Sequence, residues 1–410
     1  MKQYIIIGNG TAAVGCIEGI RSVDAKGKIT VISKEPHHVY SRPLISYYLE
    51  GKTDTERMKY RAADFYEKNG CQVLYGETAV KIDKDAKTVT TDKGRVLPYT
   101  SLCVATGSSP FVPPFEGLDT VGKKFSFMTL DDALALEQAI TEDSRVLIVG
   151  AGLIGLKCAE GIAARVGSIT VCDLADRVLS SILDAECAAV IQHHLEENGV
   201  RFLLSDSAVK FEKNTAFMKS GKTVEFDVLV LAVGVRANIA LFKEEGGEVN
   251  RGILVGDNMK TSIPNIYAAG DCTEGNDTSL GAKRVLAIMP NAYLQGQTAG
   301  INMAGGDAVF DKAIPMNSIG FFGLHIMTAG TYEGEMTEEK ENSSLKRFFV
   351  KDGLLKGFIL IGKTERAGIY TSLIRERTPL DTIDFESSKK MASNFIFSEE
   401  TRRKKFGGVV

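Results

Sequence analysis

A unit of strand, glycine-rich loop, helix and strand occurs twice in this chain and narrows its possible folds sharply. The strand-like run 4–7 leads into the first loop, Gly8-Asn9-Gly10-Thr11-Ala12-Ala13. The run 145–149 leads into the second loop, Gly150-Ala151-Gly152-Leu153-Ile154-Gly155. Such glycines permit a tight turn and a close approach of the backbone to a pyrophosphate, which N–H groups at the start of the helix can bind. Each copy therefore predicts a dinucleotide-binding βαβ unit.

Each copy also carries an acid at the end of the following strand. Glu35 lies 22 residues beyond Ala13, and Asp173 lies 18 residues beyond Gly155. Either carboxylate can accept hydrogen bonds from an adenosine ribose, and Asp173 would repel a 2′-phosphate. NADH is therefore predicted rather than NADPH, although Arg177, four residues later, could soften that preference. The alternative, glycine turns that bind no ligand, is disfavoured by two matching copies.

Other segments echo the duplication. Residues 102–107 and 228–234 are short apolar strands that end in small residues and a glycine, which lets the chain cross close to a ligand. Alternating polar and apolar residues between 76 and 98 predict a β-meander. The prolines at 110, 113 and 114 then mark a crossover into the second unit.

Composition excludes several other classes of protein. The 410 residues are 44% apolar and 25% charged, which is typical of a folded protein with two or three domains. The net charge of −3 gives no basic field, so nucleic acid is not expected as a partner. The apolar runs are too short for a membrane span, and the chain begins as a strand rather than a signal peptide. We therefore expect a cytoplasmic protein.

The seven cysteines are scattered, and the two closest in sequence are 14 residues apart. The sequence has no CxxC pair, so it indicates neither a metal or iron–sulfur site nor a local redox disulfide. We expect reduced thiols that pack as small buried hydrophobic groups, and we predict no metal site.

A third motif carries a resemblance to a known family. The run 261–271, which ends in Ala268-Ala269-Gly270-Asp271, follows the two loops, and together the three motifs resemble the pyridine nucleotide-disulfide oxidoreductase superfamily. The resemblance implies an α/β fold with two Rossmann-like, three-layer ββα domains, the NAD domain inserted in the FAD domain, and a small α+β C-terminal domain. The predicted boundaries are 1–113 and 241–314 for the FAD domain, 114–240 for the NAD(H) domain, 315–380 for the C-terminal domain, and 381–410 for a tail. The strands expected in the C-terminal domain include 345–350 and 355–361, with a turn at 351–353.

Within the superfamily, the chain is most similar to NADH:rubredoxin-type reductases and to the flavin-binding part of NADH-dependent nitrite reductases. Glu35 and the runs 40–46, 105–110 and 367–370 carry this similarity. It implies FAD and NADH as cofactors, with Arg42 near the FAD diphosphate, Asp271 on the ribityl chain, and a helix after Pro290-Asn291 directed at the flavin. The predicted cofactor-binding residues are Gly8, Gly10, Thr11, Ala12, Ala13, Glu35, Arg42, Pro43, Val80, Ala105, Thr106, Gly107, Gly150, Gly152, Ile154, Gly155, Asp173, Gly234, Gly270, Asp271 and Asn291.

The residue at position 43 indicates how electrons would leave the FAD that the resemblance implies. One branch of the superfamily has a redox-active cysteine where Pro43 aligns, and other branches have two cysteines. Proline cannot attack a disulfide or form a sulfenic acid. The resemblance thus implies that FAD takes hydride from NADH and returns electrons singly to an external acceptor, an iron–sulfur or rubredoxin-like protein or a partner subunit. Two alternatives stay open: a small-molecule reductase such as an NADH oxidase, and a redox-sensing or assembly subunit. The chain could itself form a homo-oligomer.

Lys157 is a second departure from the superfamily. Many relatives have glutamate there, paired with a lysine that aligns with Tyr47. One hypothesis gives Lys157 a catalytic role beside Pro43, stabilising reduced flavin or steering an acidic partner; the other is a surface (i, i+3) pair with Glu160.

The remaining charged features predict little chemistry. His37-His38 are expected at a polar edge, and His193-His194 on the solvated face of a surface helix. His325 follows a strand-like alternation, which suggests a structural or interface position. For the tail 381–410 we expect a solvated or disordered terminus, with docking of an acidic redox protein by its basic run 402–405 as the alternative.

Overall fold

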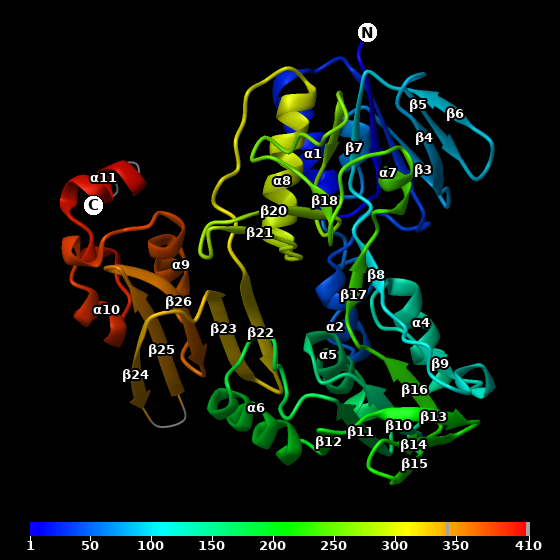
Figure 1. Cartoon of the computed structure of the whole chain (residues 1–410), viewed down its shortest axis with the longest axis vertical. Coiled ribbons are helices and arrows are strands. Elements are labelled where there is room, and N and C mark those ends of the chain that lie inside the picture. Colours follow the sequence, from blue (N-terminus) through cyan, green and yellow to red (C-terminus); the bar gives the residue numbers. More distant parts are fainter. Residues whose placement is uncertain (342–343, 407–410) are drawn as a thin grey trace.

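The structure is a computed structural model that describes residues 1–341 and 344–406. The first βαβ unit lies in a parallel sheet of order β19-β7-β1-β2-β3 (Figure 1). Its strands are β1 (Gln3–Ile7), β2 (Lys28–Ser33), β3 (Cys71–Tyr75), β7 (Ser101–Val104) and β19 (Ile266–Ala268). Helices α1 (Thr11–Val23) and α8 (Met289–Met303) lie on one side of it (Figure 1). The predicted meander forms the antiparallel strands β4 (Ala79–Asp83), β5 (Thr88–Thr91) and β6 (Val96–Pro98) on the other side.

The second unit repeats this plan. Its parallel sheet has the order β12-β11-β10-β16-β9. The strands are β9 (Lys124–Phe125), β10 (Arg145–Val149), β11 (Ser168–Asp173), β12 (Val200–Leu204) and β16 (Val228–Leu231). Helices α4 (Leu130–Ala139), α5 (Leu153–Ile162) and α6 (Ala185–Glu197) accompany it, and β13 (Ala208–Glu212), β14 (Thr215–Met218) and β15 (Thr223–Glu225) form its antiparallel companion. The predicted pair of Rossmann-like domains is confirmed.

The second sheet interrupts the first in sequence. Strand β19 pairs in parallel with β7, although the whole second sheet lies between them along the chain. One apolar core accordingly joins residues 4–105 to residues 242–304. Two antiparallel strands, β8 (Ser108–Pro110) and β17 (Val235–Ala237), connect the two sheets. The boundaries at residues 113, 240, 314 and 380 stay predictions.

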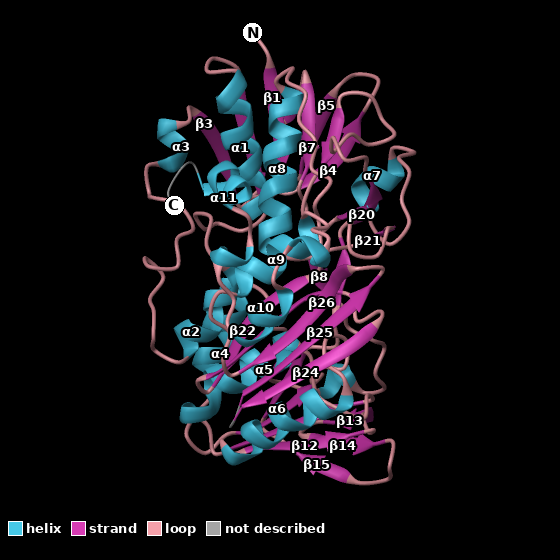
Figure 2. Ribbon diagram, turned by 90° about the vertical axis from the view of Figure 1, so that its left-hand side faces the viewer, coloured by secondary structure: helices cyan, strands magenta, loops and turns pink. Residues whose placement is uncertain are grey.

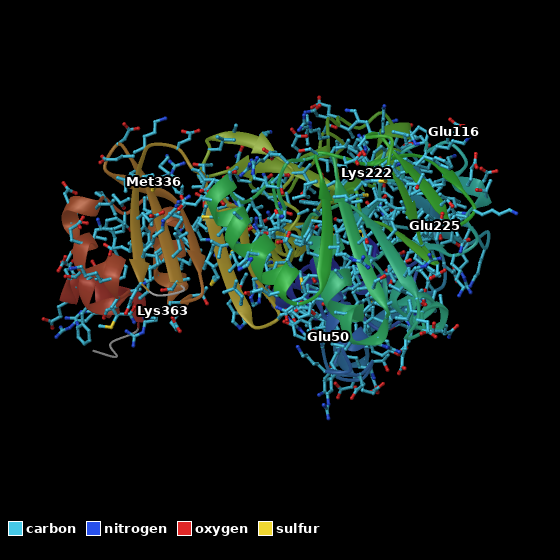
Figure 3. All side chains as sticks on the ribbon, turned by 90° about the horizontal axis from the view of Figure 1, so that it is seen from below. Glu50, Glu116, Lys222, Glu225, Met336 and Lys363 are labelled. Carbon is cyan, nitrogen blue, oxygen red and sulfur yellow. The ribbon has the colours of Figure 1, made fainter. Side chains whose placement is uncertain are left out.

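The C-terminal part is an antiparallel sheet with the order β22-β23-β26-β25-β24. Its strands are β22 (Met316–Phe321), β23 (Leu324–Gly330), β24 (Glu335–Glu341), β25 (Ser344–Lys351) and β26 (Leu354–Ile361). The predicted turn between the last two is present, with Asp352 and Gly353 at φ values of 53° and 68°. Seen from below, Met336 and Lys363 of the C-terminal part lie on one side of the molecule, away from Lys222 and Glu225 (Figure 3).

The predicted solvated tail is wrong for residues 385–397. Helix α9 (Ala367–Arg375) covers the C-terminal sheet, and α10 (Phe385–Lys390) packs beside it (Figure 2). Phe385, Ile396 and Phe397 join the same apolar core as Tyr370 of α9. The apolar residues of this segment bury themselves on the sheet, which no local pattern had indicated. The final helix α11 (Glu399–Phe406) contains the basic run 402–405, and residues 407–410 lie outside the described range.

Six of the seven cysteines are buried and all seven are free thiols, as the sequence predicted. Among residues 1–341 and 344–406, no helix is long and apolar enough to cross a membrane.

Candidate cofactor sites

In the first glycine loop, one glycine lies in tight contact with a neighbouring backbone and another lies beside open space. Gly8 has a φ of 111°, and a Cβ added there would lie 2.1 Å from the Ala105 carbonyl oxygen, so only glycine fits. Gly10 directly precedes α1, and a Cβ added there would meet no described atom within 4 Å. Glycine has no side chain that could cap the helix, so no cap side chain occupies the N–H groups of the first turn. The arrangement fits an anionic diphosphate.

The second loop repeats these features. Gly150 has a φ of 118°, and an added Cβ would lie 2.3 Å from the Ala232 carbonyl oxygen. Gly152 directly precedes α5, and a Cβ added there would meet no described atom within 4 Å. Gly155 packs against the turn itself, since its Cβ would lie 2.0 Å from the Gly150 carbonyl oxygen. The two predicted pyrophosphate loops therefore share one stereochemistry. Ile154 of the second loop is half-buried, and Gly234, with a φ of 110°, lies between β16 and β17.

Asp173 lies at the end of β11, directly beside the second loop. Its carboxylate accepts hydrogen bonds from the backbone N–H of Ala151 at 2.6 Å and of Ala175 at 2.8 Å. Arg177 pairs with Asp176 at 2.7 Å and donates to the Leu183 carbonyl at 3.3 Å. This engagement of Arg177 favours an uncompensated negative charge at Asp173, which supports the preference for NADH.

Glu35 and Arg42, predicted to bind opposite ends of one adenosine diphosphate, form an ion pair with each other. Tyr40 donates a hydrogen bond to Glu35 at 2.6 Å and accepts one from the Leu130 N–H at 2.9 Å. Burial opposes the charge of Arg42, but Tyr40, Glu35 and Asp271 raise its pKa overall. Arg42 thus stays cationic at a site where an anion would find a ready partner.

Asn238, which the sequence analysis did not single out, holds the segment that follows β7. Asn238 donates from its amide to the Thr106 carbonyl at 2.9 Å, and its own carbonyl accepts from the Thr106 hydroxyl at 2.7 Å. Gly107 follows in the left-handed conformation with a φ of 64°. Asn238 comes directly after β17, so only the pairing of β17 with β8 brings it to this position.

Asp271 and Asn291 carry polar atoms suited to a ligand. The Asp271 carboxylate is partly exposed; burial raises its pKa, while Arg42 and the Ser108 hydroxyl at 3.4 Å act in the opposite direction. Asn291 is fully buried and donates to the Ile314 carbonyl at 3.1 Å, and its Oδ1 has no hydrogen-bond donor within the described part of the chain. An orphaned buried acceptor is costly, so it fits a ligand donor. Gln295, also missed, accepts from the Gly270 N–H at 2.8 Å.

The run 40–46 contains a 3-10 turn, η1 (Arg42–Leu44), that continues into α2 (Ile45–Leu49). Pro43 is exposed at this turn. Val80 is 49% exposed on β4 at an irregularity in strand pairing. Cys16 and Cys103 are fully buried, and hydrogen bonding to Cys16 together with burial raises the pKa of Cys103. Neither thiol has the character of a nucleophile.

Lys157 forms the expected pair with Glu160, but not on the surface. Its side chain is 15% exposed and that of Glu160 is 4% exposed. The Lys157 Nζ also donates to the Gly320 carbonyl at 3.2 Å and lies 4.7 Å from the centre of the Tyr47 ring. The lysine therefore lies between α5, α2 and β22.

His37, His38 and His194 make contacts with other parts of the protein. His37 contacts Asp131 at 2.7 Å, and the ring of His38 lies edge-on to Tyr66. His194, predicted to be solvated, instead contacts the Phe321 carbonyl at 3.0 Å, because the C-terminal sheet packs over α6. His325 is exposed on β23. No group of three metal-binding side chains occurs in the portion of the chain that the structure describes.

Comparison with known proteins places these sites in context. Residues 2–296 match the protein family described as Pyridine nucleotide-disulphide oxidoreductase. The chain is 34% identical over 393 residues to NADH-dependent phenylglyoxylate dehydrogenase subunit epsilon of Aromatoleum evansii, covering 92% of each chain. It is 33% identical over 390 residues to the assimilatory nitrate reductase electron transfer subunit of Bacillus subtilis (strain 168), covering 92% of this chain and 50% of that protein.

A solved structure shares the fold. The covalent putidaredoxin reductase–putidaredoxin complex matches with a TM-score of 0.86, covering 98% of this chain and 97% of that chain, at 23% sequence identity. At this identity the match shows the common architecture of the two domains and the C-terminal sheet.

Proposed function

Because this chain belongs to the pyridine nucleotide-disulphide oxidoreductase family, we propose that it passes electrons from NADH through FAD to a separate redox protein or partner subunit. The chain is an NADH-dependent FAD oxidoreductase. The identity of the acceptor, the residues that bind each cofactor and a cytoplasmic location are parts of the proposal.

The residues present suit these two cofactors. The N-terminus of α1 beyond Gly10 would hold the FAD diphosphate together with Arg42, and Glu35 and Asp271 would accept hydrogen bonds from hydroxyl groups. The N-terminus of α5 beyond Gly152 would hold the NADH pyrophosphate, with Asp173 as the acceptor for its adenosine ribose. Bound FAD supplies the ability to take two electrons as hydride and to release them one at a time.

The observation that carries the proposal is the chemistry of position 43 and of the thiols. Pro43 is exposed in the turn Arg42–Leu44, at the position where the resemblance implies a redox-active cysteine in another branch of the superfamily. The thiols near the first loop, Cys16 and Cys103, are fully buried. Electrons on the flavin would therefore pass directly to an acceptor outside this chain rather than to a cysteine within it.

The names of the relatives support a protein acceptor. One is a subunit of an NADH-dependent dehydrogenase, and the other is an electron transfer subunit. We infer an iron–sulfur or rubredoxin-like protein, or a partner subunit, as the acceptor. Since this chain spans half of the nitrate reductase subunit, the activity of that whole protein is not carried over.

An anaerobic titration tests the proposal. NADH should bleach the flavin absorbance of the purified protein, and addition of an oxidised rubredoxin or ferredoxin should restore it. Rapid restoration by oxygen or a quinone, with none by either protein, would favour the small-molecule reductase. If NADH does not bleach the flavin, the proposal is wrong, and a sensing subunit becomes the better hypothesis.

A further inference from the structure

The side chain of Lys157 joins three segments that are far apart in sequence. Its Nζ pairs with Glu160 of the same helix, donates to the Gly320 carbonyl of β22 at 3.2 Å, and lies 4.7 Å from the Tyr47 ring of α2. The ring of Phe321 lies 5.7 Å away on a further side. A lysine with these partners is a fixed element of the interior rather than a mobile surface cation.

Glu160 extends the same network. While one carboxylate oxygen takes Lys157, the other accepts a hydrogen bond from the Phe322 N–H at 2.6 Å. The Phe321 carbonyl contacts the His194 ring at 3.0 Å. Three consecutive residues at the β22–β23 turn, Gly320 to Phe322, therefore form hydrogen bonds with side chains of α5 and α6.

On another side, Lys157 lies against the Tyr47 ring of α2. Helix α2 follows directly from the turn that contains Pro43, and Tyr47 lies four residues beyond that proline. Helices α2 and α5 touch at their backbones, since a Cβ added at Gly161 would lie 3.0 Å from the Ser46 carbonyl oxygen. Lys157 itself lies five residues beyond Gly152, one turn into the helix that begins at the NADH loop.

We propose that Lys157 is a positioning residue for the hydride transfer. Held by Glu160, Tyr47 and the Gly320 carbonyl, it fixes the start of α5, and with it the NADH loop, relative to the wall formed by Arg42 and Pro43. This inference rests on the proposed function. It disfavours steering of an acidic partner, because Glu160 neutralises the lysine and little of its side chain reaches solvent.

The chain offers a matched control. Lys52 also lies near the Tyr47 ring, at 5.8 Å, but its side chain is 59% exposed and it pairs with Glu50 at 3.1 Å. Lys52→Met removes one positive charge near the same ring without touching α5 or the β22–β23 turn. Lys157→Met removes the charge and keeps the apolar stem, and Lys157→Arg keeps a charge.

The experiment measures binding and chemistry separately on the FAD-loaded protein. Stopped-flow reduction under anaerobic conditions gives the limiting rate at saturating NADH, and titration with ADP-ribose gives affinity for the part of NADH that the α5 loop would bind. For Lys157→Met we expect the limiting rate to fall about 10-fold or more, because small misplacements of reacting groups cost that much. The ADP-ribose affinity should change less than about twofold, Lys157→Arg should recover part of the rate, and Lys52→Met should match the wild type.

Several results would overturn the inference. A wild-type limiting rate in Lys157→Met would do so, as would a parallel loss of ADP-ribose affinity, which would assign the residue to binding. A matching fall in flavin midpoint potential would assign the effect to charge instead. If Lys157→Met does not retain FAD, Tyr47→Leu removes the opposite contact and should lower the same rate; an unchanged rate there also refutes positioning. Failure of NADH to reduce the wild-type flavin would instead refute the proposed function.

Discussion

Substitution of Gly152 by alanine should weaken NADH binding while leaving the fold intact. The residue has φ −84° and ψ −175°, which alanine adopts without strain. An added Cβ would meet no described atom within 4 Å, so the protein itself accommodates the methyl group. It would, however, occupy the space at the start of α5 where a pyrophosphate would approach the backbone.

The magnitude follows from the contacts that the methyl group displaces. Losing one hydrogen bond between a backbone N–H and a charged phosphate costs about 1.5–3 kcal/mol, or about 10- to 150-fold in Kd. The cost to folding is small, because alanine is a poorer N-terminal cap than glycine by about 1 kcal/mol or less. Gly150→Ala provides the contrast: its φ of 118° alone costs about 1–3 kcal/mol, and the added Cβ would collide with the Ala232 carbonyl oxygen at 2.3 Å.

Fluorescence titration with NADH and thermal unfolding distinguish these effects. We expect Gly152→Ala to lose affinity for NADH and to retain FAD with a Tm within about 2–4 °C of the wild type. Gly150→Ala should unfold at a clearly lower temperature. The equivalent change in the first loop, Gly10→Ala, should weaken FAD and spare ADP-ribose binding. Unchanged NADH affinity in Gly152→Ala, or a loss of stability as large as that of Gly150→Ala, would refute the assignment of this loop.

Three further perturbations test the packing around the sites. Arg347→Met should lower the free energy of unfolding by about 1–3 kcal/mol in chemical denaturation, because its 6%-exposed side chain pairs with three partly exposed carboxylates, Asp184, Glu186 and Glu338; an unchanged free energy of unfolding would contradict this. Hydrogen bonds from Arg145 lower the pKa of Asp227 to about 2. The ionised carboxylate therefore stabilises the fold above its ordinary pKa of about 4, and this stabilisation is lost as the pH falls towards about 2. Asp227→Asn should flatten the pH dependence of Tm between about pH 4 and pH 2, and an unchanged slope would refute the role of this ion pair. Removal of residues 384–410 should lower Tm and raise binding of a hydrophobic dye, because it uncovers Tyr370 and its neighbours; an unaltered Tm would show that the segment is dispensable for the fold.

Local patterns account for most of the architecture. Both loops place glycine where a φ above 100° or a close backbone contact excludes any side chain, and both are followed by an acid at a strand end. These requirements act within about 30 residues, so they are visible in the sequence. The resemblance likewise implied the last hairpin, with strands at 345–350 and 355–361, and the observed strands 344–351 and 354–361 lie within one residue of those bounds.

Other parts of the candidate site depended on contacts between distant segments. Asn238 and Gln295 follow no motif, and they reach Thr106 and Gly270 only because β17 pairs with β8 and α8 packs on α1. The pairing of Glu35 with Arg42 was equally invisible, since each residue type also suits a ligand.

The sequence by itself determined that this chain builds two dinucleotide-binding units and lacks a thiol at position 43, because glycine conformations and side-chain chemistry are properties of single positions. Only the tertiary structure decided the burial and the contacts of Lys157. In sequence it was an (i, i+3) partner of Glu160, and it is buried because α2 and the β22–β23 turn close over that face of α5. Burial also drew the tail onto the C-terminal sheet. The burial of Lys157 and the packing of residues 385–397 both depend on which apolar surfaces come into contact. The packing of the whole chain determines those contacts, so no local sequence pattern predicts them.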